Sequence, residues 1–187
     1  WQDTINIGSL SNALKNTFHS YFLEYKKNMT IKYVRFFNLF SDNVLSYDEI
    51  QKRYNFTNLD FILDFFYSEN IIPFIELSYK PEKGYANIAP ASSDNIFEGE
   101  GSLSYYYATL REILRHCLNN YGLSYMSKWR FEVWFKCDED LTALETPSQY
   151  VQKYMGFYNI IKEMLPKCTI GGPGFNMSGL FKDFEQL

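Results

Sequence analysis

Five short apolar segments recur along the chain, and each of the first four is followed by a stretch whose apolar residues have helical spacing. The segments are continuous rather than alternating in character, which is typical of strands buried on both faces of a parallel sheet. The predicted strands cover residues 4–8, 31–36, 71–77, 129–135 and 168–172. Alternating strands and helices predict an α/β fold in which helices pack outside a parallel sheet. An open doubly wound sheet and a barrel both fit this order.

Two signals mark where predicted helices begin. Thr146, Pro147 and Gln149 form a capping box with proline at the first helical position, and Thr57 with Asp60 suggests a similar start. The apolar faces of the four predicted helices run from Leu10 to Tyr25, Leu59 to Phe66, Leu103 to Tyr121 and Tyr150 to Ile161. By the same spacing, residues 105–107 are expected to be core.

Composition narrows the class of protein. The chain has 187 residues, 46% of them hydrophobic and 19% aromatic, which suits one globular domain. A net charge of −4 without a Lys/Arg cluster argues against contact of this segment with nucleic acid or a membrane. Without an apolar span or a leader pattern, a cytoplasmic location is expected. Cys117, Cys137 and Cys168 lack metal-ligand spacing, so neither a metal nor a cofactor is expected.

Several stretches together resemble glycoside hydrolase family 39, the family of β-xylosidases and iduronidases with (β/α)8 barrels. They are IKYVRFFNLFSD at 31–42, YNFTNLDFILDFF at 54–66, NIIPFIELSYKP at 70–81, WRFEVWFKCDEDL at 129–141 and TIGGPG at 169–174. The resemblance implies a single partial TIM-barrel-like domain over residues 1–187, with about five of the eight β/α units of such a barrel. The strand that carries the family's nucleophilic carboxylate would then lie beyond Leu187.

The resemblance also shows two departures from the family pattern. The family's fourth strand ends in W-N-E-P, where the glutamate is the acid/base and the asparagine binds the sugar, but this chain has Phe135, Lys136 and Cys137 in place of N-E-P. An ammonium would oppose the positive charge of an oxocarbenium-like transition state, which normally requires a carboxyl pair. Phe37 likewise stands where the family has a histidine. These departures predict that the domain is not an enzyme.

Strand alternation predicts which side chains face the barrel interior. Arg35, Glu76 and Glu132 are expected to form a buried ionic cluster on that face. The cluster either satisfies the core alone, since buried charges must be paired, or is a remnant of a sugar-binding floor. The candidate ligand-binding residues are Arg35, Phe37, Asn38, Glu76, Glu132, Trp134 and Lys136.

Three hypotheses for function follow from the resemblance. The leading one is a non-catalytic ligand-sensing or interaction domain of an AraC-type bacterial transcription regulator, which binds a carbohydrate, forms a homodimer and contacts DNA through a helix-turn-helix region outside this chain. The second is the N-terminal half of an active retaining glycosidase, β-xylosidase-like, with an unusual acid among Asp138, Glu139 or Glu132. The third is a purely structural dimerisation domain.

Overall fold

The protein contains a five-stranded parallel sheet with helices on one face. The computed structural model describes residues 3–48, 50–51, 53–77, 100–135 and 145–174. The strands lie in the order β1 (Thr4–Ser9), β2 (Tyr33–Phe37), β5 (Ile72–Leu77), β6 (Arg130–Trp134) and β7 (Thr169–Gly174). All four pairings are parallel, which confirms the predicted α/β fold. Each strand adds to the same edge of the sheet, whereas a doubly wound sheet reverses direction part-way, so this is a barrel order.

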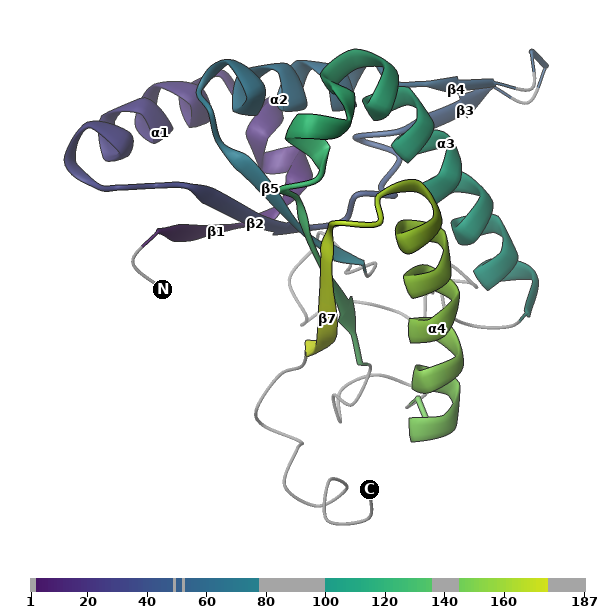
Figure 1. Ribbon diagram of the computed structural model, residues 1–187. Coiled ribbons are helices and arrows are strands. Elements are labelled where there is room, and N and C mark those ends of the chain that lie inside the picture. Colours follow the sequence, from purple (N-terminus) through teal and green to yellow (C-terminus); the bar gives the residue numbers. More distant parts are fainter. Residues whose placement is uncertain (1–2, 49, 52, 78–99, 136–144, 175–187) are drawn as a thin grey trace, which may run out of the picture.

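Four α-helices cover the sheet. They are α1 (Asn16–Asn28), α2 (Thr57–Ser68), α3 (Glu100–Met126) and α4 (Pro147–Met164). In Figure 1 the sheet curves, and the helices lie on its outer side. The predicted capping box of α4 is present, with the Thr146 hydroxyl accepting from the backbone N–H of Gln149. The outer helices and inner strands are the arrangement of part of a (β/α)8 barrel.

The first predicted helix is divided in two. Residues Leu10–Leu14 form a 3₁₀-helix, Lys15 is extended with φ −76° and ψ 130°, and α1 begins only at Asn16. In a 3₁₀ turn, residues three apart lie on the same side. This turn therefore buries both Leu10 and Ala13 at the end of β1.

Three further details differ from expectation. A short antiparallel hairpin, β3 (Ser46–Asp48) and β4 (Arg53–Asn55), lies between β2 and α2. Helix α2 has no capping box, because Phe56 is its N-cap and the Thr57 hydroxyl donates to the side chain of Asn55 instead. Tyr105 is 49% exposed and so is not core, whereas Tyr106 and Tyr107 pack against the core.

The main core lies between the sheet and the helices. Alternate strand residues such as Val34, Phe36 and Phe131 are almost fully buried there, against the inner faces of the helices. Their neighbours in sequence, Arg35 and Glu132, are only partly buried and lie on the opposite face of the sheet. That opposite face is the interior of the barrel, and it is where the candidate site lies.

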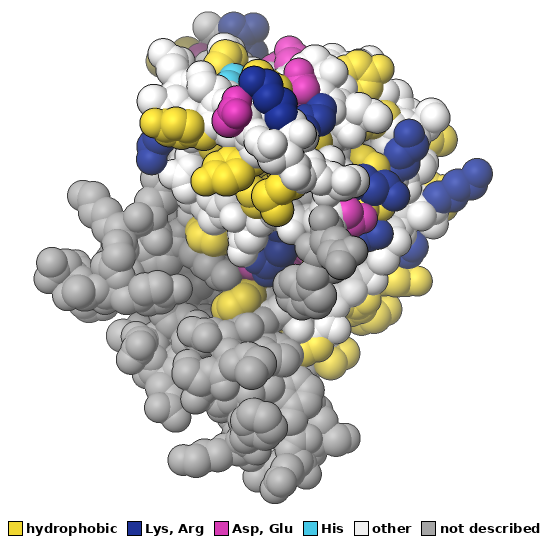
Figure 2. Space-filling model, turned by 90° about the vertical axis from the view of Figure 1, so that its left-hand side faces the viewer, with side chains coloured by type: hydrophobic (Ala, Val, Ile, Leu, Met, Phe, Trp, Pro, Cys, Tyr) yellow, Lys and Arg dark blue, Asp and Glu magenta, His cyan; other side chains and the backbone are white. Residues whose placement is uncertain are grey.

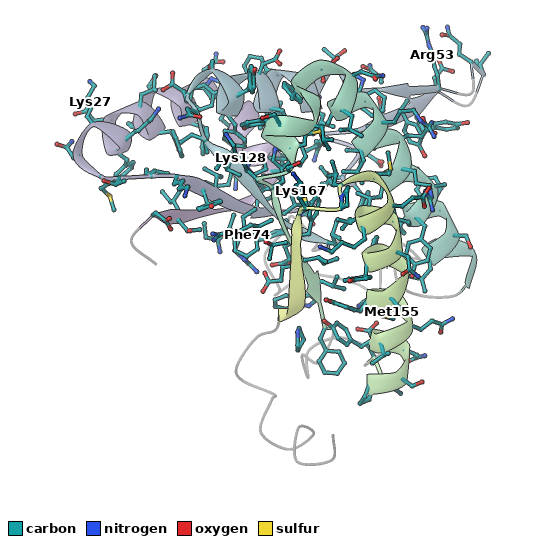
Figure 3. All side chains as sticks on the ribbon, in the orientation of Figure 1. Lys27, Arg53, Phe74, Lys128, Met155 and Lys167 are labelled. Atoms are coloured by element: carbon teal, nitrogen blue, oxygen red, sulfur yellow. The ribbon has the colours of Figure 1, made fainter. Side chains whose placement is uncertain are left out.

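The outer surface is mixed in character. Viewed from the side of α1, apolar side chains form separate groups among lysine, arginine and acidic side chains (Figure 2). Lys27, Arg53 and Met155 point outward from α1, the hairpin and α4 (Figure 3). Within the described residues, no helix is long and apolar enough to span a membrane.

Candidate functional site

Arg35 on β2 binds one carboxylate from each of the next two strands. The sheet register places Glu76 of β5 directly beside Glu132 of β6. The Nη2 atom of Arg35 donates to Glu76 Oε2 at 2.5 Å and to Glu132 Oε2 at 2.6 Å, and its Nε donates to Glu132 Oε2 at 3.0 Å. The ionic cluster expected from strand alternation therefore forms, and it joins three adjacent strands on the interior face.

The ionic cluster is largely buried. The Glu76 side chain is fully buried, while those of Arg35 and Glu132 are 20% and 21% exposed. Burial by itself lowers the pKa of Arg35, but the charges of Glu76 and Glu132 and their hydrogen bonds outweigh this effect and raise it above its ordinary value. The guanidinium also lies 5.9 Å from the centroid of the Phe74 ring, labelled in Figure 3. The cluster thus consists of an arginine paired with one fully buried carboxylate and one partly exposed carboxylate.

The carboxyl end of β2 holds two other candidates. Asn38 is fully buried with φ 62°, in the left-handed region that asparagine tolerates better than most residues. Its Nδ2 donates to the Ser9 hydroxyl at 3.4 Å, which links the ends of β1 and β2. Phe37 lies beside Gly8, where an added Cβ would be 3.9 Å from the Phe37 Cζ atom. Both residues therefore contact the end of β1, which lies beside β2.

The end of β6 carries the remaining candidates. Trp134 is half-buried and, two residues beyond Glu132, shares its face of the sheet. Phe135 is buried and packs edge-on against Tyr150 of α4 with ring centroids 5.2 Å apart. Lys136 lies outside the described residues, as do Asp138 and Glu139.

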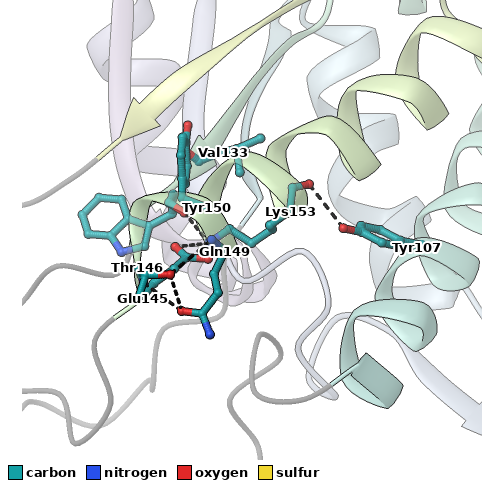
Figure 4. A network of polar contacts seen from close by, with 8 residues as sticks. Tyr107, Val133, Glu145, Thr146, Gln149, Tyr150 and Lys153 are labelled. Atoms are coloured by element: carbon teal, nitrogen blue, oxygen red, sulfur yellow. Dashed lines mark hydrogen bonds and ion pairs between the residues drawn. The ribbon is translucent and has the colours of Figure 1, made fainter. Parts of the chain in front are cut away.

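A second buried ion pair lies next to the backbone of Trp134, and the sequence analysis did not predict it. Lys153 of α4 is 1% exposed and its Nζ donates to Glu145 Oε2 at 2.6 Å; the side chain of Glu145 is 8% exposed. Figure 4 shows the Lys153 side chain reaching back toward Glu145. A signal was available, because Lys153 is three residues after Tyr150 and four before Phe157, which places a lysine on the apolar face of the helix.

Gly174 of β7 makes room for the Glu132 side chain. A Cβ at Gly174 would lie 2.6 Å from Cδ and 2.7 Å from Oε1 of Glu132. Gly174→Ala is expected to push Glu132 away from Arg35, at a cost of only about 1 kcal/mol, since the displaced group is the partly exposed end of a flexible side chain. The Nε–H resonance of Arg35 in NMR spectra should shift strongly while chemical denaturation changes little.

Gly171 of the same strand provides the control for that experiment. No atom lies within 4 Å of a Cβ at Gly171, so Gly171→Ala should leave the Arg35 resonance in place. An unchanged Arg35 signal in the Gly174 variant would show that Glu132 does not depend on this glycine.

The described residues offer no metal centre. Within residues 3–77 and 100–174, leaving aside their undescribed positions, no group of three or more His, Cys, Asp or Glu side chains could hold a metal ion. His116 and Asp60, paired at 2.6 Å, lie on the outer helices α3 and α2.

Comparison with known proteins now identifies the family. The profile of glycosyl hydrolases family 39 matches residues 1–187. The chain is 27% identical over 190 residues to a β-xylosidase of Geobacillus stearothermophilus, covering 92% of this chain and 36% of that protein. It is 29% identical over 125 residues to the α-L-iduronidase of Canis lupus familiaris, covering 65% of this chain and 17% of that protein. The chain thus spans about a third or less of the length of these relatives.

Solved structures share the fold. A family 39 β-xylosidase from Caulobacter crescentus superposes with a TM-score of 0.77 at 20% identity, covering 98% of this chain and 42% of that one. The family 39 enzyme from Xanthomonas axonopodis pv. citri gives a TM-score of 0.75 at 20% identity, covering 92% of this chain and 35% of that one. At this identity the likeness establishes the fold, and it confirms the expected partial barrel.

The prediction that the domain is not an enzyme is wrong. It rested on Lys136 and on the strands that this chain does not include, whereas the relatives that match nearly the whole chain are named as β-xylosidases. A single residue, Lys136, does not outweigh a family match over residues 1–187. The chain belongs to glycosyl hydrolases family 39.

Proposed function

We propose that this chain is part of a retaining glycosidase that acts on a carbohydrate of the β-xyloside type, and that its interior face forms the floor of the sugar-binding site. The observation that carries the proposal is the cluster in which Arg35 holds Glu76 and Glu132 together on that face. The names of the relatives supply the substrate class.

The physical character of the face suits a sugar. Sugar hydroxyls both donate and accept hydrogen bonds, and carboxylate oxygens are strong acceptors. Glu132 keeps 21% of its side chain exposed although it is bound to Arg35, so it can accept from a hydroxyl without losing its charge partner. Trp134, on the same face and nearer the end of β6, offers an aromatic surface on which a sugar ring can pack. Barrel sites lie at this carboxyl end of the strands.

The general acid that protonates the leaving group must be a residue other than Lys136. A retaining mechanism uses two carboxyl groups about 5 to 5.5 Å apart, one of which protonates the leaving group. Glu132 is a poor choice because two guanidinium N–H groups already bind its Oε2 atom. Asp138 and Glu139, which follow β6 in sequence, are therefore the proposed sources of the acid, while the nucleophile comes from a strand outside this chain.

Hydrolysis of aryl β-xylosides by the full-length protein tests this proposal. We expect turnover that falls by about 10²- to 10⁴-fold in Asp138→Asn or in Glu139→Gln, whichever removes the acid, because general acid catalysis contributes that much. Glu163→Gln is the matched control, since Glu163 lies on the outer side of α4, with 62% of its side chain exposed, and pairs with Arg111. Absence of turnover in the unaltered protein, against a panel of β-linked aryl glycosides, would refute the proposal.

Carbohydrate sensing within an AraC-type regulator is a second candidate. The observation that favours it is Lys136 at the position of the family acid/base. It predicts saturable sugar binding by the full-length protein with a shift in assembly state. A melting temperature raised by xylose or xylo-oligosaccharides, together with a change in molecular mass in solution, would support this candidate.

A further inference from the structure

The ammonium of Lys153 joins two points of the chain that are eleven positions apart in sequence, Trp134 and Glu145. Its Nζ donates to the backbone carbonyl of Trp134 at 2.7 Å and to Glu145 Oε2 at 2.6 Å. Trp134 is the last residue of β6, and Glu145 comes immediately before Thr146, the N-cap of α4. Lys153 therefore fixes the point where the strand ends to the point where the helix begins (Figure 4).

The peptide between Trp134 and Phe135 is held from both sides. Its carbonyl oxygen accepts from Lys153, and its N–H, which belongs to Phe135, donates to the carbonyl of Gly174 at 2.7 Å. The Tyr150 hydroxyl donates to the preceding Val133 carbonyl at 3.4 Å, one turn of α4 from Lys153. The backbone direction at the end of β6 is therefore set by α4 on one side and by β7 on the other.

Folding alone does not require a charge at this position. Burying an ammonium and a carboxylate has a desolvation cost that their attraction often only offsets, and apolar residues of similar volume usually replace such pairs without loss of stability. The tip of Lys153 also lies 5.5 Å from the Tyr150 ring centroid, within an otherwise apolar region of α4. A methionine at position 153 could not donate hydrogen bonds to the Trp134 carbonyl and the Glu145 carboxylate.

We propose that Lys153 is a positioning residue for the active site, which acts by holding the Trp134–Phe135 peptide and Glu145 in fixed places. The inference rests on the proposed glycosidase function. It implies that Trp134, the proposed surface for the sugar ring, depends on Lys153 for its alignment with the sugar.

The test compares Lys153→Met and Lys162→Met in the full-length protein. Lys162 is the matched control, because it lies on the same helix and also donates to a backbone carbonyl, that of Cys168 at 2.5 Å, but at the opposite end of the sheet. In Lys153→Met we expect amide hydrogen exchange at Phe135 to become about tenfold faster. We also expect kcat on aryl β-xylosides to fall about 10- to 100-fold with less than about threefold change in KM. Lys162→Met should leave Phe135 exchange and kcat unchanged.

The double variant Lys153→Met, Glu145→Leu separates positioning from stability. It removes both charges, so the melting temperature lost in Lys153→Met through the broken ion pair with Glu145 should return. Positioning predicts that Phe135 exchange stays fast and kcat stays low in the double variant. Recovery of both, together with the melting temperature, would overturn the proposal, as would unchanged Phe135 exchange in Lys153→Met. If the unaltered protein shows no turnover, the glycosidase function is refuted but the positioning role of Lys153 is not. The exchange rate of the Phe135 amide in Lys153→Met would then decide whether Lys153 positions this peptide.

Discussion

Arg35→Leu should destabilise the protein by about 3–5 kcal/mol, because it breaks the ion pair of a fully buried carboxylate. Glu76 is 0% exposed and shares the Arg35 guanidinium with Glu132, whose carboxylate lies beside it on the next strand. Without the arginine, two negative charges face each other on the sheet. Urea denaturation at neutral pH measures the change in the free energy of unfolding. The dependence of that free energy on urea concentration, the m-value, should be the same for the variant and the unaltered protein.

Removing the buried partner as well should restore most of that stability. Arg35→Leu, Glu76→Leu leaves only Glu132, which is partly exposed and can remain hydrated. Because an apolar replacement of a buried pair is often neutral, we expect the double variant to lie within about 2 kcal/mol of the unaltered protein. A double variant as unstable as Arg35→Leu alone would mean that packing, rather than charge, dominates this part of the barrel.

Gly156→Ala should destabilise the protein by about 1–3 kcal/mol, although alanine is the better helix former by about 1 kcal/mol. Gly156 lies in the middle of α4, where a Cβ would be 2.2 Å from the Tyr107 hydroxyl oxygen and 2.3 Å from its Cζ atom. Tyr107 cannot easily move aside, since its ring packs edge-on against Phe157 and its hydroxyl donates to the Lys153 carbonyl at 3.3 Å. Thermal unfolding followed by circular dichroism measures the effect.

A double-mutant cycle with Tyr107→Ala identifies the cause. Truncating Tyr107 removes the atoms that the new Cβ would meet, so Gly156→Ala should be neutral or stabilising in that background. We expect a coupling free energy of about 1–3 kcal/mol between the two sites. Strictly additive effects would show that the two helices do not meet at this glycine.

Much of the interior face could be predicted from local sequence. The period of two in parallel strands determines which side chains share a face, and this is enough to bring Arg35, Glu76 and Glu132 together once the strands are in register. The start of α4 was equally predictable, because its capping box depends only on residues three apart.

Features that depend on tertiary contacts could not be predicted in this way. The division of the first helix reflects the burial of Leu10 and Ala13 against the sheet, which outweighs helical spacing. Tyr105 matched the apolar helical pattern but lies where no neighbouring element covers it fully. Lys153 binds a backbone carbonyl, which every residue has, so the sequence contains no signal for that contact.

The sequential order of the strands has a consequence for how the chain acquires its structure. Each strand of the sheet after β1 pairs with the preceding strand of the same sheet, so every new β/α unit docks onto one already formed. These parallel pairings still close long loops, since Phe74 and Arg130, which are paired across β5 and β6, are 56 positions apart, and such pairing slows folding. Assembly can nevertheless follow the order of synthesis, with β1 and β2 serving as the template for β5, β6 and β7.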